Sequence, residues 1–252
     1  MNAAGIGVDA GSTVVKACAV TAAGSRIWQH VELTEPRLEE QARRIAALAR
    51  EQAGAAPLVA TGYGRKLVAG AERAITEITC HARGVFAELG SGGTVVDIGG
   101  QDSKVISVGA DGSVRNFAMN DKCAAGTGRF LEVTAARLRL AVEEIGAMAL
   151  AAAEEVPISS TCAVFAESEI VSLIARGAAL EAIVRGLHRS LVARLASLVR
   201  SLGIVEPVAL SGGVARNPAI AAFLAEALGC EVKLPEAPQL MGAYGAALLA
   251  LD

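Results

Sequence analysis

Residues 5–20 read GIGVDAGSTVVKACAV, and residues 93–108 repeat the same pattern as GTVVDIGGQDSKVISV. Each stretch ends an apolar run with an aspartate, Asp9 or Asp97, passes through glycine and enters a second apolar run. Two apolar runs separated by glycine and polar residues are typical of two strands joined by a tight turn. Because the pattern recurs after about 90 residues, we predict an α/β fold of two similar lobes with a cleft between them.

Further elements follow each stretch in a similar order. A third strand is predicted at residues 26–33 in the first half and at residues 114–118 in the second half. Apolar residues at helical spacing predict helices over residues 37–53 and 76–89. The remaining predicted elements are strands at residues 58–60, 207–210 and 231–234, and helices at residues 127–138, 163–176, 179–202, 218–228 and from Met241 onward.

Three glycine-rich turns indicate a phosphate-binding site. The first is GVDAGST, residues 7–13, with Lys16 beyond it, and the second is VVDIGGQD, residues 95–102, with Lys104 beyond it. The third, SGGVARNP at residues 211–218, leads from a strand into a helix. Glycine lets the backbone approach a phosphate closely, and consecutive N–H groups bind anions. Carboxylates at strand ends bind Mg²⁺ directly or through water, and a lysine offsets phosphate charge.

The chain lacks the G-x-x-x-x-G-K-[ST] motif of a P-loop and a G-x-G-x-x-G motif that leads into a helix. The order of its three turns resembles instead the two phosphate motifs and the adenosine motif of the acetate and sugar kinase, heat-shock chaperone and actin superfamily. This resemblance implies two ribonuclease-H-like lobes, an actin-like ATPase fold, with ATP and Mg²⁺ in the cleft.

The same resemblance implies roles for individual residues. Asp9 and Asp97 would organise Mg²⁺, and Gln101 would orient the attacking water, although Gln101 can also be a plain turn residue. No side chain is assigned as a general base for hydrolysis. The residues expected around the nucleotide are Gly11, Ser12, Thr13, Lys16, Gly99 and Gly100 at the phosphates, Gly212, Gly213 and Asn217 near adenosine, and Gln239 and Gly242 closing over it.

Two of the five cysteines stand out. Cys123 and Cys162 each lie in a Gly/Ser/Thr-rich loop just before a predicted helix, where the helix N-terminus stabilises a thiolate. A [4Fe–4S] cluster needs about four thiolates, so these two would form half of a site that a symmetric dimer completes. Cys18, Cys80 and Cys230 are expected to be buried small residues. His81 and His188 are expected to be packed or surface histidines.

The segments around these cysteines are NDKCAAGTGRFLE, residues 120–132, and SSTCAVFAESE, residues 159–169. They closely resemble the ATP-dependent activators of 2-hydroxyacyl-CoA dehydratases and the related ATPase subunits of benzoyl-CoA reductases. The resemblance covers nearly the whole chain and includes ATGYGR at residues 60–65 and GLHRS at residues 186–190.

This resemblance implies a homodimer with one bridging [4Fe–4S] cluster, bound by Cys123 and Cys162 of each subunit. It also implies ATP-driven one-electron transfer. The electron would come from a ferredoxin or flavodoxin and pass to an iron–sulfur dehydratase, a benzoyl-CoA reductase core or another double-cluster reductase. Nothing in the sequence identifies the organic substrate of that acceptor.

Two other functions remain open. The first is a small-molecule kinase of the same superfamily, for which Asp121 is the candidate that would deprotonate a hydroxyl, but this leaves the two cysteines without a role. The second is a structural or assembly ATPase, for which 252 residues leave little room for a polymer interface or a substrate domain. The predicted domains are lobe I, residues 1–90 completed by the C-terminal helix 241–252, and lobe II, residues 91–240 with the cluster cysteines.

The composition narrows the class of protein and its expected location in the cell. The chain is 53% hydrophobic and 19% charged with a net charge of −3, which is typical of a folded domain. It has no basic stripe for nucleic acid or membrane surfaces and no apolar run of about 18 residues. The N-terminus lacks a basic segment followed by an apolar one, so we expect a cytoplasmic protein.

Overall fold

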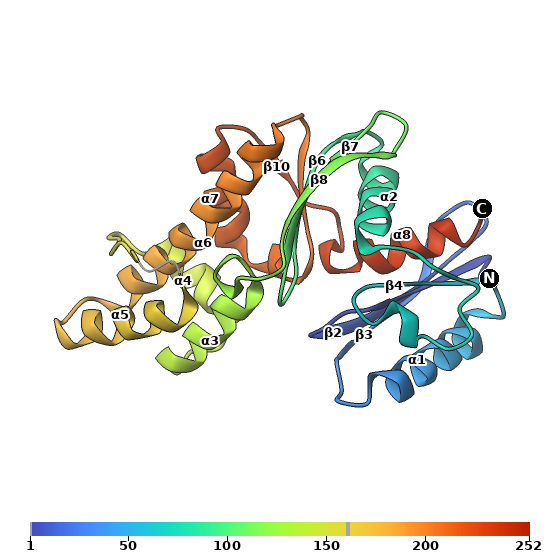
Figure 1. Ribbon diagram of the computed structural model, residues 1–252, viewed down its shortest axis with the longest axis horizontal. Coiled ribbons are helices and arrows are strands. Elements are labelled where there is room, and N and C mark those ends of the chain that lie inside the picture. The colour runs from blue at the N-terminus through green and yellow to red at the C-terminus, as the bar shows by residue number, and fades with distance from the viewer. Residues whose placement is uncertain (1, 160–161) are drawn as a thin grey trace.

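The computed structural model describes residues 2–159 and 162–252, which form two five-stranded mixed sheets flanked by helices (Figure 1). The first sheet has the strand order β3-β2-β1-β4-β5. Its central strand β1 is buried along its whole length, as its apolar sequence predicts. The strands are β1 Gly5–Ala10, β2 Val14–Val20, β3 Arg26–Leu33, β4 Leu58–Thr61 and β5 Arg73–Ala74.

The second sheet repeats this plan in the order β10-β9-β6-β7-β8. In both sheets the central strand pairs antiparallel with the following strand and parallel with a later one, β4 or β9. The predicted α/β fold of two similar halves is therefore confirmed. The strands are β6 Gly93–Ile98, β7 Ser103–Val108, β8 Val114–Asn120, β9 Val208–Ser211 and β10 Val232–Lys233.

The helices agree with the expected ranges to within a few residues, with one addition. Helix α4 was not predicted, because its seven residues are mostly alanine and glycine and too short for a clear period. The α-helices are α1 Leu38–Ala53, α2 Glu77–Leu89, α3 Gly128–Leu138, α4 Ile145–Ala151, α5 Ala163–Ala175, α6 Leu180–Leu202, α7 Pro218–Leu228 and α8 Met241–Leu249. Short 3₁₀ turns are η1 Arg65–Leu67, η2 Ala124–Gly126, η3 Gly213–Arg216 and η4 Pro238–Leu240.

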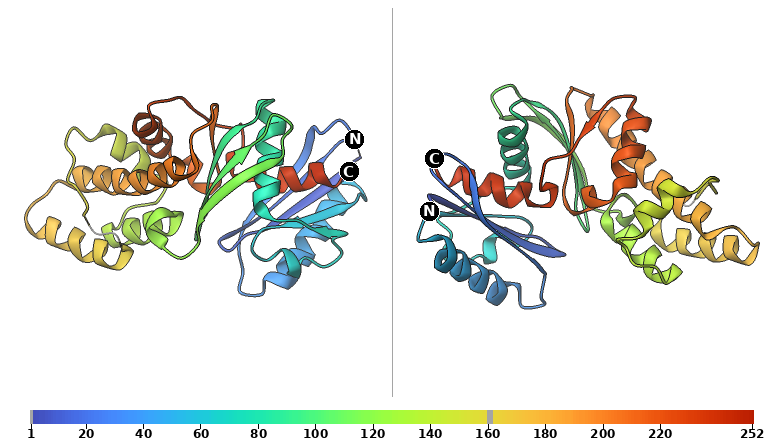
Figure 2. Two further views of the ribbon diagram at one scale, coloured as in Figure 1. Left: turned by 45° about the horizontal axis from the view of Figure 1, so that its top comes forward. Right: turned by 180° about the vertical axis from the view of Figure 1, so that it is seen from behind.

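Helices α2 and α8 pack against each other between the two sheets (Figure 2). Helix α8 also covers β1, β2 and β4 of the first sheet, whereas α2 contacts β6, β7 and β9 of the second. The two helices approach closely at glycine, because a Cβ on Gly245 would lie 1.8 Å from the carbonyl oxygen of Cys80. Helix α2 thus follows the first sheet in the chain but packs on the second, whereas α8 follows the second sheet but packs on the first.

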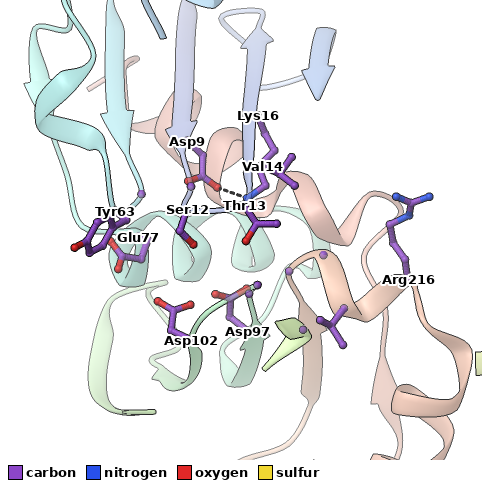
Figure 3. A pocket seen from close by; sticks show the side chains of 18 of the residues that line it. Asp9, Ser12, Thr13, Val14, Lys16, Tyr63, Glu77, Asp97, Asp102 and Arg216 are labelled. Carbon is purple, nitrogen blue, oxygen red and sulfur yellow. Dashed lines mark hydrogen bonds and ion pairs between the residues drawn. The ribbon is translucent and has the colours of Figure 1, made fainter. Parts of the chain in front are cut away.

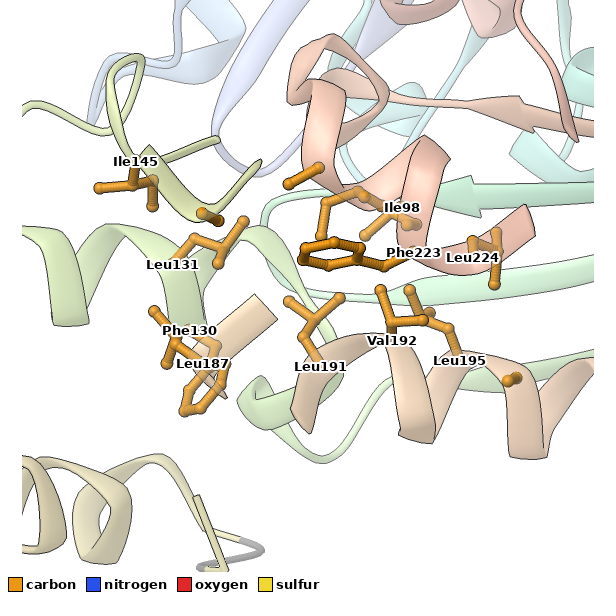
Figure 4. Packing of buried hydrophobic residues seen from close by; sticks show 14 of the residues in the cluster. Ile98, Phe130, Leu131, Ile145, Leu187, Leu191, Val192, Leu195, Phe223 and Leu224 are labelled. Carbon is orange, nitrogen blue, oxygen red and sulfur yellow. The ribbon is translucent and has the colours of Figure 1, made fainter. Parts of the chain in front are cut away.

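The second half has its own hydrophobic core, formed where α3, α6 and α7 cover one face of the second sheet (Figure 4). Phe130 of α3 and Leu191 of α6 are fully buried in it, and Ile98 reaches it from β6. Because this core joins α3 to the sheet, it positions the loop that precedes α3. None of the helices among the described residues is long and apolar enough to cross a bilayer.

Candidate functional site

A cavity of ≈ 520 Å³ lies where the turns of both sheets meet (Figure 3). This volume is within the usual range for small-ligand sites. Asp9 and Asp97 approach it from opposite sheets, Tyr63 and Glu77 lie at one end, and Arg216 lies at the other. The predicted residues that line it are Asp9, Gly11, Ser12, Thr13, Lys16, Asp97, Gly99, Gly100, Gly212, Gly213 and Asn217.

The first two turns touch each other across the cavity. A Cβ on Gly100 would lie only 2.1 Å from Thr13 Oγ1, so residue 100 must be glycine for the turns to approach this closely. Around the first turn, Lys16 Nζ lies 3.1 Å from Asp9 Oδ2, and Asp9 is buried. The turns therefore bring backbone N–H groups, a carboxylate and an ammonium group to one place, which suits a polyphosphate with a divalent cation.

Asp97 is the most heavily contacted group of the site. Ser211 Oγ donates a 3.2 Å hydrogen bond to Asp97 Oδ1, and Lys104 Nζ lies 3.6 Å from Asp97 Oδ2 and 2.8 Å from Asp102 Oδ2. Burial by itself would raise the pKa of Asp97, but His81, Lys104 and Lys16 nearby and the hydrogen bond from Ser211 lower it below its usual value. Burial likewise opposes the charge of Lys104, yet Asp97 and Asp102 raise its pKa. Both groups are thus held in their charged forms.

The third turn, residues 211–218, is held in place by a hydrogen bond to a buried histidine. Asn217 caps α7, with its Oδ1 accepting from the Ala219 N–H at 3.1 Å, and its Nδ2 lies 2.9 Å from His188 Nε2. His188 Nδ1 donates to the Val184 carbonyl at 2.8 Å, so Nε2 accepts from Asn217. Burial lowers the pKa of His188 more than the Val184 hydrogen bond raises it, which keeps the ring neutral.

Three predicted nucleotide residues lie beside the cavity rather than in its lining. Gln101 is exposed on the second turn. Gln239 lies in η4, where the Pro238 carbonyl accepts the Gly212 N–H at 2.9 Å. Gly242 is buried behind Asp9, since a Cβ there would lie 2.9 Å from Asp9 Oδ2. Their roles toward a nucleotide stay predictions.

The sequence analysis missed several residues that line the cavity. His81 and Glu77 reach it from α2, and Tyr63 reaches it from the glycine-rich loop after β4. Lys104 pairs with Asp97 across β6 and β7, just as Lys16 pairs with Asp9 across β1 and β2. The repeated pattern of the two stretches already pointed to Lys104 beside the second turn, but only the crossing of α2 between the sheets brings His81 to the cavity.

The cysteines fall into two groups. Cys123 is exposed before η2 and α3, and Cys162 is partly exposed as the residue that caps α5. Burial raises the pKa of Cys18 and of Cys80 to about 12, which opposes the thiolate form that metal ligation requires. Cys230 is half-buried, so its expected full burial was wrong. Cys123 and Cys162 are therefore better placed than Cys18 and Cys80 to bind a metal.

The loop that carries Cys123 is held from two sides. The Asn120 side chain accepts from the Cys123 N–H at 3.2 Å and donates to its carbonyl at 2.8 Å. Arg194 of α6 lines a cavity of ≈ 290 Å³ together with Cys123 and donates to the Ala125 carbonyl at 3.5 Å. Among the described residues, no three His, Cys, Asp or Glu side chains gather as a metal site.

Helix α5, which begins just after Cys162, exposes a large apolar surface. Val164 is 68% exposed and Phe165 is 69% exposed, while Ile174 near its C-terminal end is 49% exposed. Helix α5 contacts α3 and α6, but only Ala166 and Ile170 on it are buried. Several exposed apolar side chains on one helix are typical of a protein interface.

The comparisons with protein families and with curated proteins both point to ATPases that activate dehydratases and to their relatives. Residues 6–250 match the model of the BadF/BadG/BcrA/BcrD ATPase family. The 2-hydroxyisocaproyl-CoA dehydratase activator of Clostridioides difficile is 43% identical over 253 residues, which span 98% of this chain and 94% of that protein.

Two solved structures are similar over nearly the whole chain. The activator of the 2-hydroxyisocaproyl-CoA dehydratase from Clostridium difficile with bound ADPNP is 42% identical with a TM-score of 0.89, and the match covers 98% of this chain and 94% of that one. Component A of the (R)-2-hydroxyglutaryl-CoA dehydratase from Acidaminococcus fermentans is 39% identical with a TM-score of 0.92. The match covers 98% of this chain and 97% of that one.

Proposed function

This chain belongs to the BadF/BadG/BcrA/BcrD ATPase family, and on that premise we propose that it is an ATP-dependent activator that delivers single electrons. The electron would pass from a ferredoxin or flavodoxin, through a [4Fe–4S] cluster bridging a homodimer, to a 2-hydroxyacyl-CoA dehydratase or a related double-cluster or benzoyl-CoA-type reductase. The observation that carries the proposal is that Cys123 and Cys162 are both accessible on loops that lead into helices, while Cys18 and Cys80 are buried. We place the protein in the cytoplasm.

The nucleotide half of the proposal rests on the cavity between the sheets. Asp9 and Asp97 would hold Mg²⁺, directly or through water, and Mg²⁺ would neutralise the phosphate charge when bound. Ser12, Thr13, Lys16 and the Gly99–Gly100 turn would hold the phosphates of ATP or ADP. The close approach of Thr13 and Gly100 supports this, because a phosphate bound beside this contact would face both halves of the chain at once.

The electron-transfer half rests on the two accessible cysteines. A [4Fe–4S] cluster takes about four thiolates, so two from each of two identical chains match its ligand requirement on a twofold axis. Cys123 and Cys162 fit that donor set, because both are accessible and lie on loops that lead into helices. The exposed apolar side chains of α5, next to Cys162, would be covered in the dimer. The cluster would supply one-electron chemistry at low potential.

Coupling between the two halves requires that ATP and ADP favour different arrangements of the lobes. We take the lobes as residues 1–90 with 241–252 and residues 91–240, which meet where α2 packs against the second sheet. The second phosphate turn is linked directly to the start of α3, the helix after Cys123, because the Gly99 carbonyl accepts the Gly128 N–H at 2.9 Å and the Gly100 carbonyl accepts the Arg129 N–H at 2.8 Å. A shift of this turn would therefore move the start of α3.

The first test is iron and acid-labile sulfide analysis on anaerobically purified protein, with its mass in solution. We expect about four of each per dimer, lost in Cys123→Ser and retained in Cys230→Ser, where Cys230 is the matched control because it is also partly exposed. A colourless protein without iron would contradict the proposal. Phosphorylation of hydroxyl substrates would then be screened, with Asp121→Asn as the first variant.

A further inference from the structure

His81 is the one histidine in the lining of the nucleotide cavity, among the residues that the structure describes. It is only 5% exposed, and its Nδ1 lies 3.1 Å from Ser211 Oγ and 3.3 Å from Asp97 Oδ1. Ser211 has one proton and donates it to Asp97 Oδ1 at 3.2 Å. His81 Nδ1–H must therefore donate to Ser211 Oγ, which makes a chain of hydrogen bonds from α2 through β9 to β6.

The other edge of the ring faces the first half of the molecule. A Cβ on Gly242 would lie 2.9 Å from His81 Nε2 and also 2.9 Å from Asp9 Oδ2. The imidazole therefore contacts Asp97 through Nδ1, while its Nε2 and Asp9 Oδ2 both lie next to Gly242. Residue 242 must be glycine to leave room for both groups. His81 is thus placed where α2, α8 and both sheets meet.

We propose that His81 is a positioning residue of the ATPase site, which fixes the orientation of the Asp97 carboxylate by hydrogen-bonding Ser211. This inference rests on the proposed role of Asp97 toward Mg²⁺. A carboxylate on a single rotatable bond turns easily, and hydrogen bonds to one of its oxygens leave the other with a defined direction. Here Oδ1 accepts from Ser211, while Oδ2 lies on the side of Lys104. Losing such an outer contact typically weakens metal affinity or activity about 10- to 100-fold.

Two amide substitutions separate this role from simple packing. His81→Asn keeps a donor near the position of Nδ1, His81→Gln places its amide nearer Nε2, and His81→Ala keeps neither. ATPase rates are measured against Mg²⁺ and ATP concentration, with thermal unfolding as a check on folding. For His81→Ala and His81→Gln we expect kcat about 10- to 100-fold lower and a raised Mg²⁺ requirement, with KM for ATP changed less. His81→Asn should recover most of the rate.

Ser211→Ala should match His81→Ala, and the double variant should be no worse than either, because both interrupt the same chain. His30→Asn is the control, since His30 pairs with Glu32 on β3 away from the cavity. Equal losses in His81→Asn and His81→Ala with an unchanged Mg²⁺ requirement would overturn the inference. Asp97→Asn, run in the same assay, tests the underlying assignment separately: if it keeps full activity, the Mg²⁺ role of Asp97 fails, whatever His81 does.

Discussion

Asp97 faces Lys104 across the β6–β7 pair in the same register in which Asp9 faces Lys16 across β1–β2. The two pairs differ in their surroundings, because the Lys104 side chain is 3% exposed and that of Lys16 is 17% exposed. Removing Lys104 leaves two carboxylates, Asp97 and Asp102, without their buried cation, whereas removing the partly exposed Lys16 leaves one, Asp9. The two halves thus repeat one Asp–Lys pair, and we expect the pair in the second half to contribute more to the free energy of unfolding.

The first prediction follows from this difference. Lys104→Met should lower the free energy of unfolding by about 3 kcal/mol, because Asp97 and Asp102 both lose their buried cation. Lys16→Met should lower it by less, about 1–2 kcal/mol, because one carboxylate, Asp9, loses its partner and the Lys16 side chain is already partly in water. Urea unfolding of both variants, without nucleotide or Mg²⁺, measures the contrast. Equal losses in the two variants would show that burial does not distinguish the pairs.

The second prediction concerns the exposed apolar side chains of α5. Phe165→Glu should weaken self-association at least about tenfold, because it places a charge in an interface that the proposed dimer buries. Sedimentation over a concentration series measures the dissociation constant. Val205→Glu is the matched control, since Val205 is 52% exposed in the loop before β9. A Phe165→Glu dimer as tight as the parent, or equal weakening by both variants, would place the interface elsewhere.

The third prediction uses the neutral ring of His188. In the unfolded chain this histidine binds a proton below about pH 6.5, but burial lowers its pKa in the folded state. The unfolded state therefore binds more protons, and stability falls as the pH drops below about 6.5, by up to about 1.4 kcal/mol per pH unit.

His188→Gln should flatten this dependence, because it removes the titrating ring at the same buried position. Unfolding free energies from urea titrations at pH 5.5 and pH 7.5 provide the comparison, with His30→Gln as the control. The pKa of His188 is lowered by burial, whereas His30 is paired with Glu32 on the surface of β3. If the parent and His188→Gln lose the same stability on acidification, His188 does not carry the effect.

The fourth prediction tests the close contact of α2 and α8. Gly245→Ala should lower the free energy of unfolding by about 3 kcal/mol, because its Cβ would lie 1.8 Å from the Cys80 carbonyl oxygen and the helices would have to separate. Gly213→Ala is the comparison, since a Cβ there meets no described atom within 4 Å. Thermal unfolding of both variants gives the result. A Gly245→Ala protein as stable as Gly213→Ala would mean that the helices adjust without cost.

Much of the fold could be predicted from the sequence, because its local signals are strong. The runs around Asp9 and Asp97 combine apolar alternation with glycine turns, and both became strand pairs. Helix α4 was missed because residues 145–151 are too few and too rich in alanine to show a period. The short strand β5, Arg73–Ala74, is exposed and has no apolar face to reveal it.

The candidate site could be predicted where its residues lie on the repeated turns, and not where it depends on contacts between the two halves. Thr13 and Gly100 were expected at phosphates, but their mutual contact follows only from the packing of the sheets. His81 is one residue of a helix that looks like any amphipathic segment. Its contact with Ser211 joins positions 130 residues apart in sequence, and no local pattern encodes that distance.

The place of α8 also has a consequence for how the chain is made. Residues 241–249 cover β1, β2 and β4, which are synthesised more than 150 residues earlier. During translation the first sheet therefore leaves the ribosome with one face bare, and buried side chains such as Cys18 gain their cover only when α8 emerges. The half whose synthesis begins first is therefore the half whose core is completed last.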